Sequence, residues 1–240
     1  MNIYSTMKGK LVLIPTPIDE ATTLEGTALK CLLASCSKKE SNVFLVEDIR
    51  PCRRRWLRWG LPRDLVDDLV EYNEHTRAGL IDPLIKQLKS GKTIYLMSDG
   101  GLPAFCDPGQ ELIDQCHRSK IVVTATPFSN SVALAVALSG YNHQQFVFNG
   151  FLPVKNPERE QAYQKLVKEK RTQILMDTPY RLKKTLEELD RHWGKTEFFL
   201  GLDLNNPTEL ATRGNAANYL KSLKDFKREF IIVLPATASI

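Results

Sequence analysis

The strongest constraint on the fold is an alternation of short apolar runs with longer amphipathic runs along the chain. Four apolar runs in the first half, rich in Val, Ile and Leu, cover residues 10–14, 42–46, 93–97 and 121–124. Such near-continuous runs are typical of strands in a parallel sheet that is covered on both faces. The segments between them carry apolar residues at helical spacing. The first half therefore predicts an α/β unit with a mostly parallel sheet.

The second half repeats this scheme. Its length allows a second small α/β domain, so we expect domains at residues 1–119 and 120–240. The predicted second-half helices cover residues 132–138, 158–170 and 182–192, and the predicted strands cover 146–149, 172–176, 197–202 and 229–234. In the first half we expect helices over 24–36 and 80–89, the first with Thr22 and Glu25 as a capping box.

A loop with two glycines and two aspartates, residues 98–109, follows the apolar run 93–97. Ligands of open α/β sheets bind outside the carboxyl ends of the strands, where such loops lie. Gly100 and Gly101 favour a close ligand approach, and Asp99 suits an ammonium group or a ribose hydroxyl. For Asp107 we favour a structural role as the N-cap of a helix that starts at Pro108.

Proline loops also follow three other predicted strands, at residues 15–18, 126–131 and 177–181. One such loop is usually a turn, but four loops at comparable strand ends indicate a shared crevice.

Composition and the remaining motifs exclude several classes. No metal-ligand spacing is present among the four histidines and five cysteines, so no metal is expected. No phosphate-binding P-loop, dinucleotide fingerprint or nucleophile elbow occurs. We expect no membrane association and a cytoplasmic protein, since no apolar stretch approaches the length of a membrane span. The net charge of +5 is compatible with an RNA partner.

Seven ordered segments together resemble the tetrapyrrole methylase superfamily of S-adenosylmethionine-dependent methyltransferases, most closely its ribosomal RNA small subunit methyltransferase I branch. The segments cover nearly the whole chain and are Ile14-Pro15-Thr16-Pro17-Ile18, Val46-Glu47-Asp48-Ile49-Arg50, Tyr72-Asn73-Glu74-His75-Thr76, the 98–109 loop, Pro127-Phe128-Ser129-Asn130, Phe148-Asn149-Gly150-Phe151-Leu152-Pro153 and Asp177-Thr178-Pro179-Tyr180-Arg181.

The resemblance implies two α/β domains with a cofactor cleft between them, a mixed second sheet, S-adenosylmethionine as cofactor and a homodimer. It implies cofactor contacts from Pro15, Asp99, Gly100, Gly101, Leu102, Asp107, Ser129, Asn130, Phe151, Leu152 and Met176. If the acceptor is a ribose hydroxyl, a base helps to remove its proton, and the candidates are Glu47, Asp48 and His75. Each candidate has a structural alternative as a helix cap or, for the two acids, a bridge to Arg50.

The chain departs from the superfamily pattern in its second-half loops. Phe128 replaces a glycine, Asn130 a serine, and the last loop has Asp177 and Tyr180 in place of Glu and His. For Phe128 we expect a ring packed under its loop rather than one that blocks the cofactor pocket.

A further departure is an arginine-rich stretch with two tryptophans, Trp56 and Trp59. It is either an RNA-binding edge, with arginines on phosphates and tryptophans on bases, or an amphipathic helix whose tryptophans face the core or a dimer partner. The RNA reading assigns contacts to Arg50, Arg53, Arg54, Arg55 and Arg58.

The sequence therefore predicts a methyltransferase that acts on a ribose hydroxyl of small-subunit ribosomal RNA. The alternatives are a methyltransferase of a tetrapyrrole-like small molecule and a non-catalytic relative that binds S-adenosylmethionine or RNA.

Overall fold

The computed structural model describes residues 9–128 and 130–236 of the 240-residue chain. It divides into two compact units, Met1–Phe128 and Ser129–Ile240. The seam expected at 119/120 differs from this division because residues 122–125 pair with the first strand and so belong to the first sheet.

The first unit is built on a five-stranded parallel sheet. Its strands follow the order β3-β2-β4-β1-β5, and every neighbouring pair is parallel. The strands are β1 (Lys10–Ile14), β2 (Asn42–Val46), β3 (Val70–Glu71), β4 (Thr93–Met97) and β5 (Val122–Ala125). The predicted parallel sheet is confirmed, and the carboxyl ends of its strands meet at one edge.

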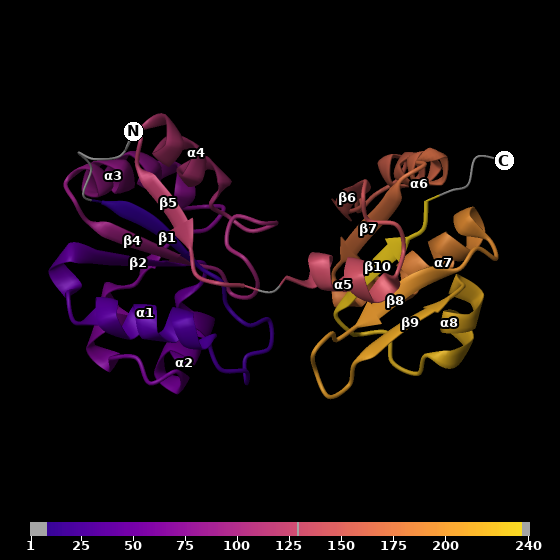
Figure 1. The fold of residues 1–240 in the computed structure, drawn as a ribbon, viewed down its shortest axis with the longest axis horizontal. Helices are drawn as coiled ribbons and strands as arrows, with labels where there is room; N and C mark the ends of the chain where they lie inside the picture. Colours follow the sequence, from indigo (N-terminus) through magenta and orange to yellow (C-terminus); the bar gives the residue numbers. More distant parts are fainter. Residues whose placement is uncertain (1–8, 129, 237–240) are drawn as a thin grey trace. The chain divides into compact units, whose positions relative to one another are not determined.

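Helices cover both faces of this sheet (Figure 1). On one face, α1 (Gly26–Cys36) and α2 (Ile49–Arg58) pack on Val12, Ile14 and other inward-pointing strand residues. On the other face, α3 (Arg77–Lys89) and α4 (Gln110–Arg118) pack on alternate strand residues such as Leu11. Since successive strand side chains point to opposite faces, the unbroken apolar strands provide both cores. Short helices η1 (Lys39–Ser41) and η2 (Arg63–Asp68) complete the unit.

The start of α1 corrects one expectation. Thr22 donates to the Asp19 carboxylate, whereas Glu25 is itself the N-cap and accepts the backbone N–H of Ala28 at 2.9 Å. The predicted capping box was therefore wrong, because the helix begins one turn later than Thr22 requires.

The second unit is built on a mixed sheet in the order β6-β7-β10-β8-β9, in which only β6 and β7 are parallel. The expected mixed sheet is confirmed. Its strands are β6 (Phe146–Phe151), β7 (Thr172–Asp177), β8 (Phe198–Leu202), β9 (Leu210–Gly214) and β10 (Phe230–Leu234).

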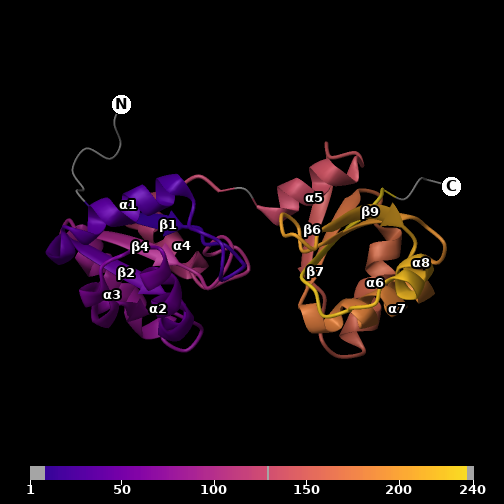
Figure 2. The ribbon, with the colours of Figure 1, turned by 90° about the horizontal axis from the view of Figure 1, so that it is seen from below.

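Helix α5 (Ser131–Ser139) covers one face of this second sheet, and three helices cover the other (Figure 2). The three are α6 (Glu158–Lys168), α7 (Leu182–Trp193) and α8 (Ala216–Ser222), and a short helix η3 (Pro179–Arg181) precedes α7. Within residues 9–128 and 130–236, no helix has the length and apolar character needed to cross a membrane.

Candidate functional site

The loops that follow β1 and β4 are joined at the carboxyl edge of the first sheet. Thr16 and Gly101 exchange two backbone hydrogen bonds, of 2.9 and 2.8 Å. The Thr16 hydroxyl also donates to the Ser98 carbonyl at 2.8 Å. Neighbouring parallel strands end at the same edge, so two segments far apart in sequence form one surface there.

Gly100 and Gly101 are required by this junction. A Cβ on Gly100 would lie 3.1 Å from the Ile18 Cα and 3.5 Å from the Pro17 carbonyl oxygen. Gly101 has a φ of +97°, which residues with a side chain rarely adopt. The glycines therefore have a structural reason within the chain, in addition to the ligand approach that the sequence favours.

Asp99 and Glu47 link the loop after β4 to the loop after β2. The Asp99 N–H donates to the Glu47 carboxylate at 3.1 Å, and the Asp48 N–H donates to the Asp99 carboxylate. Burial, and next the nearby Glu47 carboxylate, raise the pKa of Asp99 to about 6. The hydrogen bond from the Asp48 N–H lowers it by less. Asp99 is thus a half-buried acid that titrates close to neutrality.

Asp107 shares this environment and does not cap a helix. Helix α4 begins at Gln110, and its N-cap is Gly109, with a φ of +144°. Asp107 instead lies near the Ser98 side chain, while burial, and then Glu47, raise its pKa to about 6. The predicted N-cap role was wrong.

The 98–109 loop carries two further unusual backbone conformations, since Ala104 and Cys106 have φ values of +66° and +69°. Non-glycine residues in this region cost free energy and cluster at functional sites.

The other two predicted bases have different surroundings. Asp48 is the N-cap of α2, and its carboxylate accepts the Arg50 N–H at 2.7 Å. His75 is exposed in the turn that precedes α3, where its backbone N–H donates to Asn73 Oδ1. Asp48 therefore has the capping role foreseen as its structural alternative, whereas His75 provides no cap.

Sequence reasoning missed Asn73. Its Nδ2 donates to the Glu47 carbonyl at 3.4 Å, and its Oδ1 organises the turn before α3. The signal was present, because Asn73 lies in the family-like segment that follows β3, the strand beside β2.

The arginine-rich stretch forms α2, with Trp56 and Trp59 in the first core. This placement confirms the amphipathic-helix reading for the tryptophans, so neither ring is available to stack on a base. Trp56 Nε1 donates to the Pro62 carbonyl at 2.8 Å.

Three arginines of α2 hold the loop after β1. Arg55 is buried and donates to the Pro17 and Ile18 carbonyls, the latter at 3.1 Å. Arg54 pairs with the Glu20 carboxylate at 2.7 Å, and Arg58 donates to the Glu20 carbonyl at 2.6 Å. Their first role is thus to fix residues 17–20 on α2.

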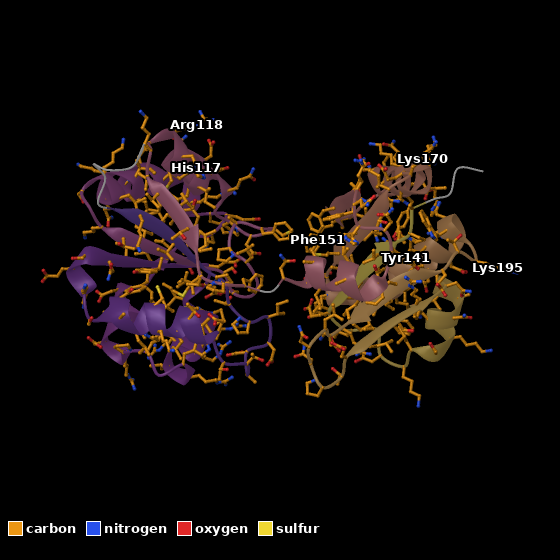
Figure 3. The ribbon with its side chains drawn as sticks, viewed as in Figure 1. His117, Arg118, Tyr141, Phe151, Lys170 and Lys195 are labelled. Carbon is orange, nitrogen blue, oxygen red and sulfur yellow. The ribbon has the colours of Figure 1, made fainter. Side chains whose placement is uncertain are left out.

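The residues that the family pattern assigns to the second unit lie at several places. Asn130 is the N-cap of α5 and accepts the Ala133 N–H at 2.8 Å. Phe151, at the end of β6, is 48 % exposed (Figure 3), Leu152 is buried, and Met176 at the end of β7 is half-buried. Ser129 lies outside the described residues.

Phe128, at the end of the first unit, is 39 % exposed. The expectation that its ring packs under the loop was therefore wrong. The preceding residue, Pro127, is exposed as well.

A buried ion-pair network stabilises the strand ends of the second unit. Arg159 is 1 % exposed and contacts Glu188 at 2.6 Å and Asp177 at 3.4 Å. It also donates to the Pro153 carbonyl at 2.9 Å, so it joins the segment after β6 to the end of β7 and to α7.

In residues 9–128 and 130–236, no three His, Cys, Asp or Glu side chains are grouped as metal ligands.

Comparison with known proteins defines the family. The model of the Tetrapyrrole (Corrin/Porphyrin) Methylases matches residues 22–217. The chain belongs to this family. It is a methyltransferase, as the sequence predicts.

Curated relatives lie in one branch of the family. The chain is similar to the ribosomal RNA small subunit methyltransferase I of Halalkalibacterium halodurans, with 31 % identity over 95 % of this chain and 76 % of the relative. The protein of the same name from Thermotoga maritima is 29 % identical over 91 % of this chain and 94 % of the relative.

Solved structures share the fold at lower identity. A diphthine synthase superposes with a TM-score of 0.62 and 12 % identity, over 94 % of this chain and 89 % of that one. A uroporphyrin-III C-methyltransferase from Thermus thermophilus, solved with S-adenosylhomocysteine, gives a TM-score of 0.54 and 17 % identity, over 95 % of this chain and 97 % of that one. These likenesses support the fold alone.

Proposed function

We propose that this protein transfers a methyl group from S-adenosylmethionine to a ribose 2′-hydroxyl of small-subunit ribosomal RNA. The observation that carries the proposal is the joined edge of the first sheet, where Thr16–Gly101 and Glu47–Asp99 bring three family-like loops together. The curated relatives that are about 30 % identical act, by name, on ribosomal RNA, whereas the uroporphyrin-type structure is 17 % identical. This difference favours RNA over a tetrapyrrole as substrate.

The joined edge supplies chemistry that suits the donor. Asp99 and Asp107 carry negative charge above pH 6, which attracts the cationic donor, and Gly100 leaves backbone groups accessible. The first-unit contacts in this proposal are Pro15, Asp99, Gly100, Gly101, Leu102 and Asp107. Following the family resemblance, we also propose Ser129, Asn130, Phe151, Leu152 and Met176 as donor contacts.

The chemistry requires little covalent help from the protein. Methyl transfer is a displacement at carbon, and the donor sulfonium is already electrophilic, so the chain mainly aligns the reactants and excludes water. A base is needed only for the hydroxyl proton. We assign positioning roles to Asp48, which caps α2, and to Glu47, which holds the Asp99 N–H. This leaves His75 as the candidate base.

The side-chain contacts within the first unit reduce the number of α2 arginines that are available for RNA. Arg54, Arg55 and Arg58 already bind the loop after β1, so we assign phosphate contacts first to Arg50 and Arg53, which are both exposed on α2. Following the family resemblance, we also propose a homodimer and a cytoplasmic location.

Calorimetric titration with S-adenosylmethionine tests the donor site. We expect saturable binding at one site per chain, weakened at least ten-fold by Asp99→Ala. Asp114→Ala, on the exposed surface of α4, is the matched control and retains wild-type affinity. No binding by folded wild-type protein, or equal loss in both variants, would contradict the proposed site.

A further inference from the structure

Tyr180 is the most exposed large apolar or aromatic side chain among the described residues, at 76 %. It lies in η3, between β7 and α7 of the second unit. The Lys227 ammonium lies over one face of the ring, 4.8 Å from its centroid. With so much of the ring exposed, its other face is open to solvent.

The backbone beneath this ring is held firmly. Pro179 restricts the preceding residue, and the Arg181 N–H donates to the Thr178 carbonyl at 2.9 Å. The Arg181 guanidinium pairs with Asp177 at 3.0 Å, and Asp177 also contacts the buried Arg159. The ring thus projects from a fixed base, which lowers the entropic cost of stacking on it.

Exposed lysines lie on two segments near the ring. Phe230 pairs with Asp177, so the chain before β10 runs beside the end of β7 (Figure 1). Lys183, at the start of α7, lies over the Phe226 ring at 5.9 Å, which ties the two segments together. The exposed Tyr180 and its exposed lysine neighbours, here called the Tyr180 surface, are Tyr180, Lys183, Lys184, Lys224 and Lys227.

The acidic groups of these segments only partly offset that charge. Asp177 and Glu188 are buried against Arg159, and Lys184 lies 4.0 Å from Glu188. Three exposed acids, Glu187, Asp225 and Glu229, stand against the four lysines, which leaves the surface with a small positive balance. Arg228 is not part of the surface, because it pairs with Asp203 at 2.7 Å.

We propose that the Tyr180 surface binds a single-stranded segment of RNA. One base stacks on the open face of Tyr180, and the lysines contact the flanking phosphates. Exposed aromatic rings among lysines are the usual means of holding unpaired bases, whereas protein interfaces are depleted in lysine. The inference rests on the proposed RNA substrate and adds a second-unit contact to it, next to the end of β7 that carries Met176.

Fluorescence anisotropy with a labelled single-stranded RNA tests the Tyr180 surface in the full-length protein. Tyr180→Ala is expected to weaken binding roughly five-fold or more, since stacking on one aromatic ring contributes about 1–3 kcal/mol. Tyr180→Phe keeps the ring and is expected to remain within two-fold of wild type. Lys227→Ala is expected to reduce the slope of log affinity against log salt by about 0.7, as loss of one phosphate contact does.

Lys195→Ala is the matched control, because Lys195 is an exposed lysine just beyond the other end of α7 (Figure 3). It is expected to bind RNA like wild type. Titration with S-adenosylmethionine checks that every variant is folded and binds the donor.

The outcomes separate the two claims. If wild type binds RNA and Tyr180→Ala binds equally well, the Tyr180 surface is overturned while the proposed function stands. If the variant binds RNA normally but loses affinity for whole small ribosomal subunits, the surface contacts protein, which also overturns it. If wild type binds neither RNA nor subunits, both claims fail.

Discussion

Asp99 and Asp107 are two acids whose burial next to Glu47 raises the pKa of each to about 6. A carboxyl with a raised pKa in the folded state favours its neutral form. Its stabilising contribution is therefore present below the unfolded value of 3.8 and is lost as pH rises through 6. These acids lower stability at neutral pH, which is consistent with a role in binding rather than in folding.

Asp99→Asn tests this sign. Asn retains an oxygen for the Asp48 N–H and removes the charge, so we expect a Tm about 2 °C above wild type at pH 7. The gain disappears at pH 4, where the wild-type carboxyl is protonated. Scanning calorimetry at both pH values measures the Tm of the variant minus that of wild type. A smaller difference at pH 7 than at pH 4 would contradict the raised pKa of Asp99.

Ionisation of Asp99 and Asp107 lowers stability, but we expect it to raise the affinity for S-adenosylmethionine. Ionised carboxylates attract the cationic S-adenosylmethionine, so we expect its affinity to fall about ten-fold between pH 7 and pH 5, one unit below the pKa. Calorimetric titration across this range measures it. An affinity that does not change with pH in wild type would show that these acids do not face the donor.

Residue-level patterns were the least reliable part of the sequence analysis. Asp48 and Asp107 both precede helix-like segments, but only Asp48 is an N-cap. Asp107 lies near Ser98 and Glu47, and Gly109 has a backbone conformation that starts α4 at Gln110 instead. Such long-range contacts cannot be read from local spacing.

At the scale of elements, the link between α2 and the loop after β1 depends on Arg55. We expect Arg55→Ala to lower the free energy of unfolding by about 2 kcal/mol, because it leaves the Pro17 and Ile18 carbonyls without their charged donor. Arg53→Ala, on the exposed side of the same helix, changes it by less than about 0.5 kcal/mol. Urea denaturation of both variants compares them, and equal effects would rule out the link.

The Arg159 network makes a corresponding prediction for the second unit. Arg159→Leu leaves Glu188 buried with only the more distant Lys184, at 4.0 Å, as a charged partner, at an expected cost of about 3–5 kcal/mol. Adding Glu188→Leu removes that charge, and Asp177 keeps Arg181 as its partner, so much of the loss is recovered. A double-mutant cycle by denaturation measures the coupling. Additive losses would show that the two charges do not interact.

Elements with strong apolar patterns were predicted well. Strands β1, β2 and β4 have the predicted bounds, because strands buried on both faces are apolar throughout. Strand β9 and helix α8 were missed. Among the described strands, the edge strand β9 pairs only with β8. It alternates between exposed and half-buried residues, so its five residues carry little apolar signal.

At the scale of the whole molecule, the two α/β units and the family could be predicted from ordered motifs spread along the chain. The boundary between the units after Phe128 could not be predicted. It depends on the pairing of β5 with β1, and no change in composition marks this boundary. The sequence analysis grouped four loops, at residues 15–18, 98–109, 126–131 and 177–181, and the structure joins the first two of them by the Thr16–Gly101 hydrogen bonds. Their cross-links, Thr16 with Gly101 and Glu47 with Asp99, emerge only from the strand order.

The central claim is methyl transfer to the ribose of small-subunit ribosomal RNA. The most direct measurement incubates the protein with labelled S-adenosylmethionine and unmethylated small ribosomal subunits, followed by digestion of the RNA to nucleosides. We predict that the label appears in one 2′-O-methylated nucleoside and is lost with Asp99→Ala. Label on a base, or no label in RNA from a protein that binds the donor, would contradict the account.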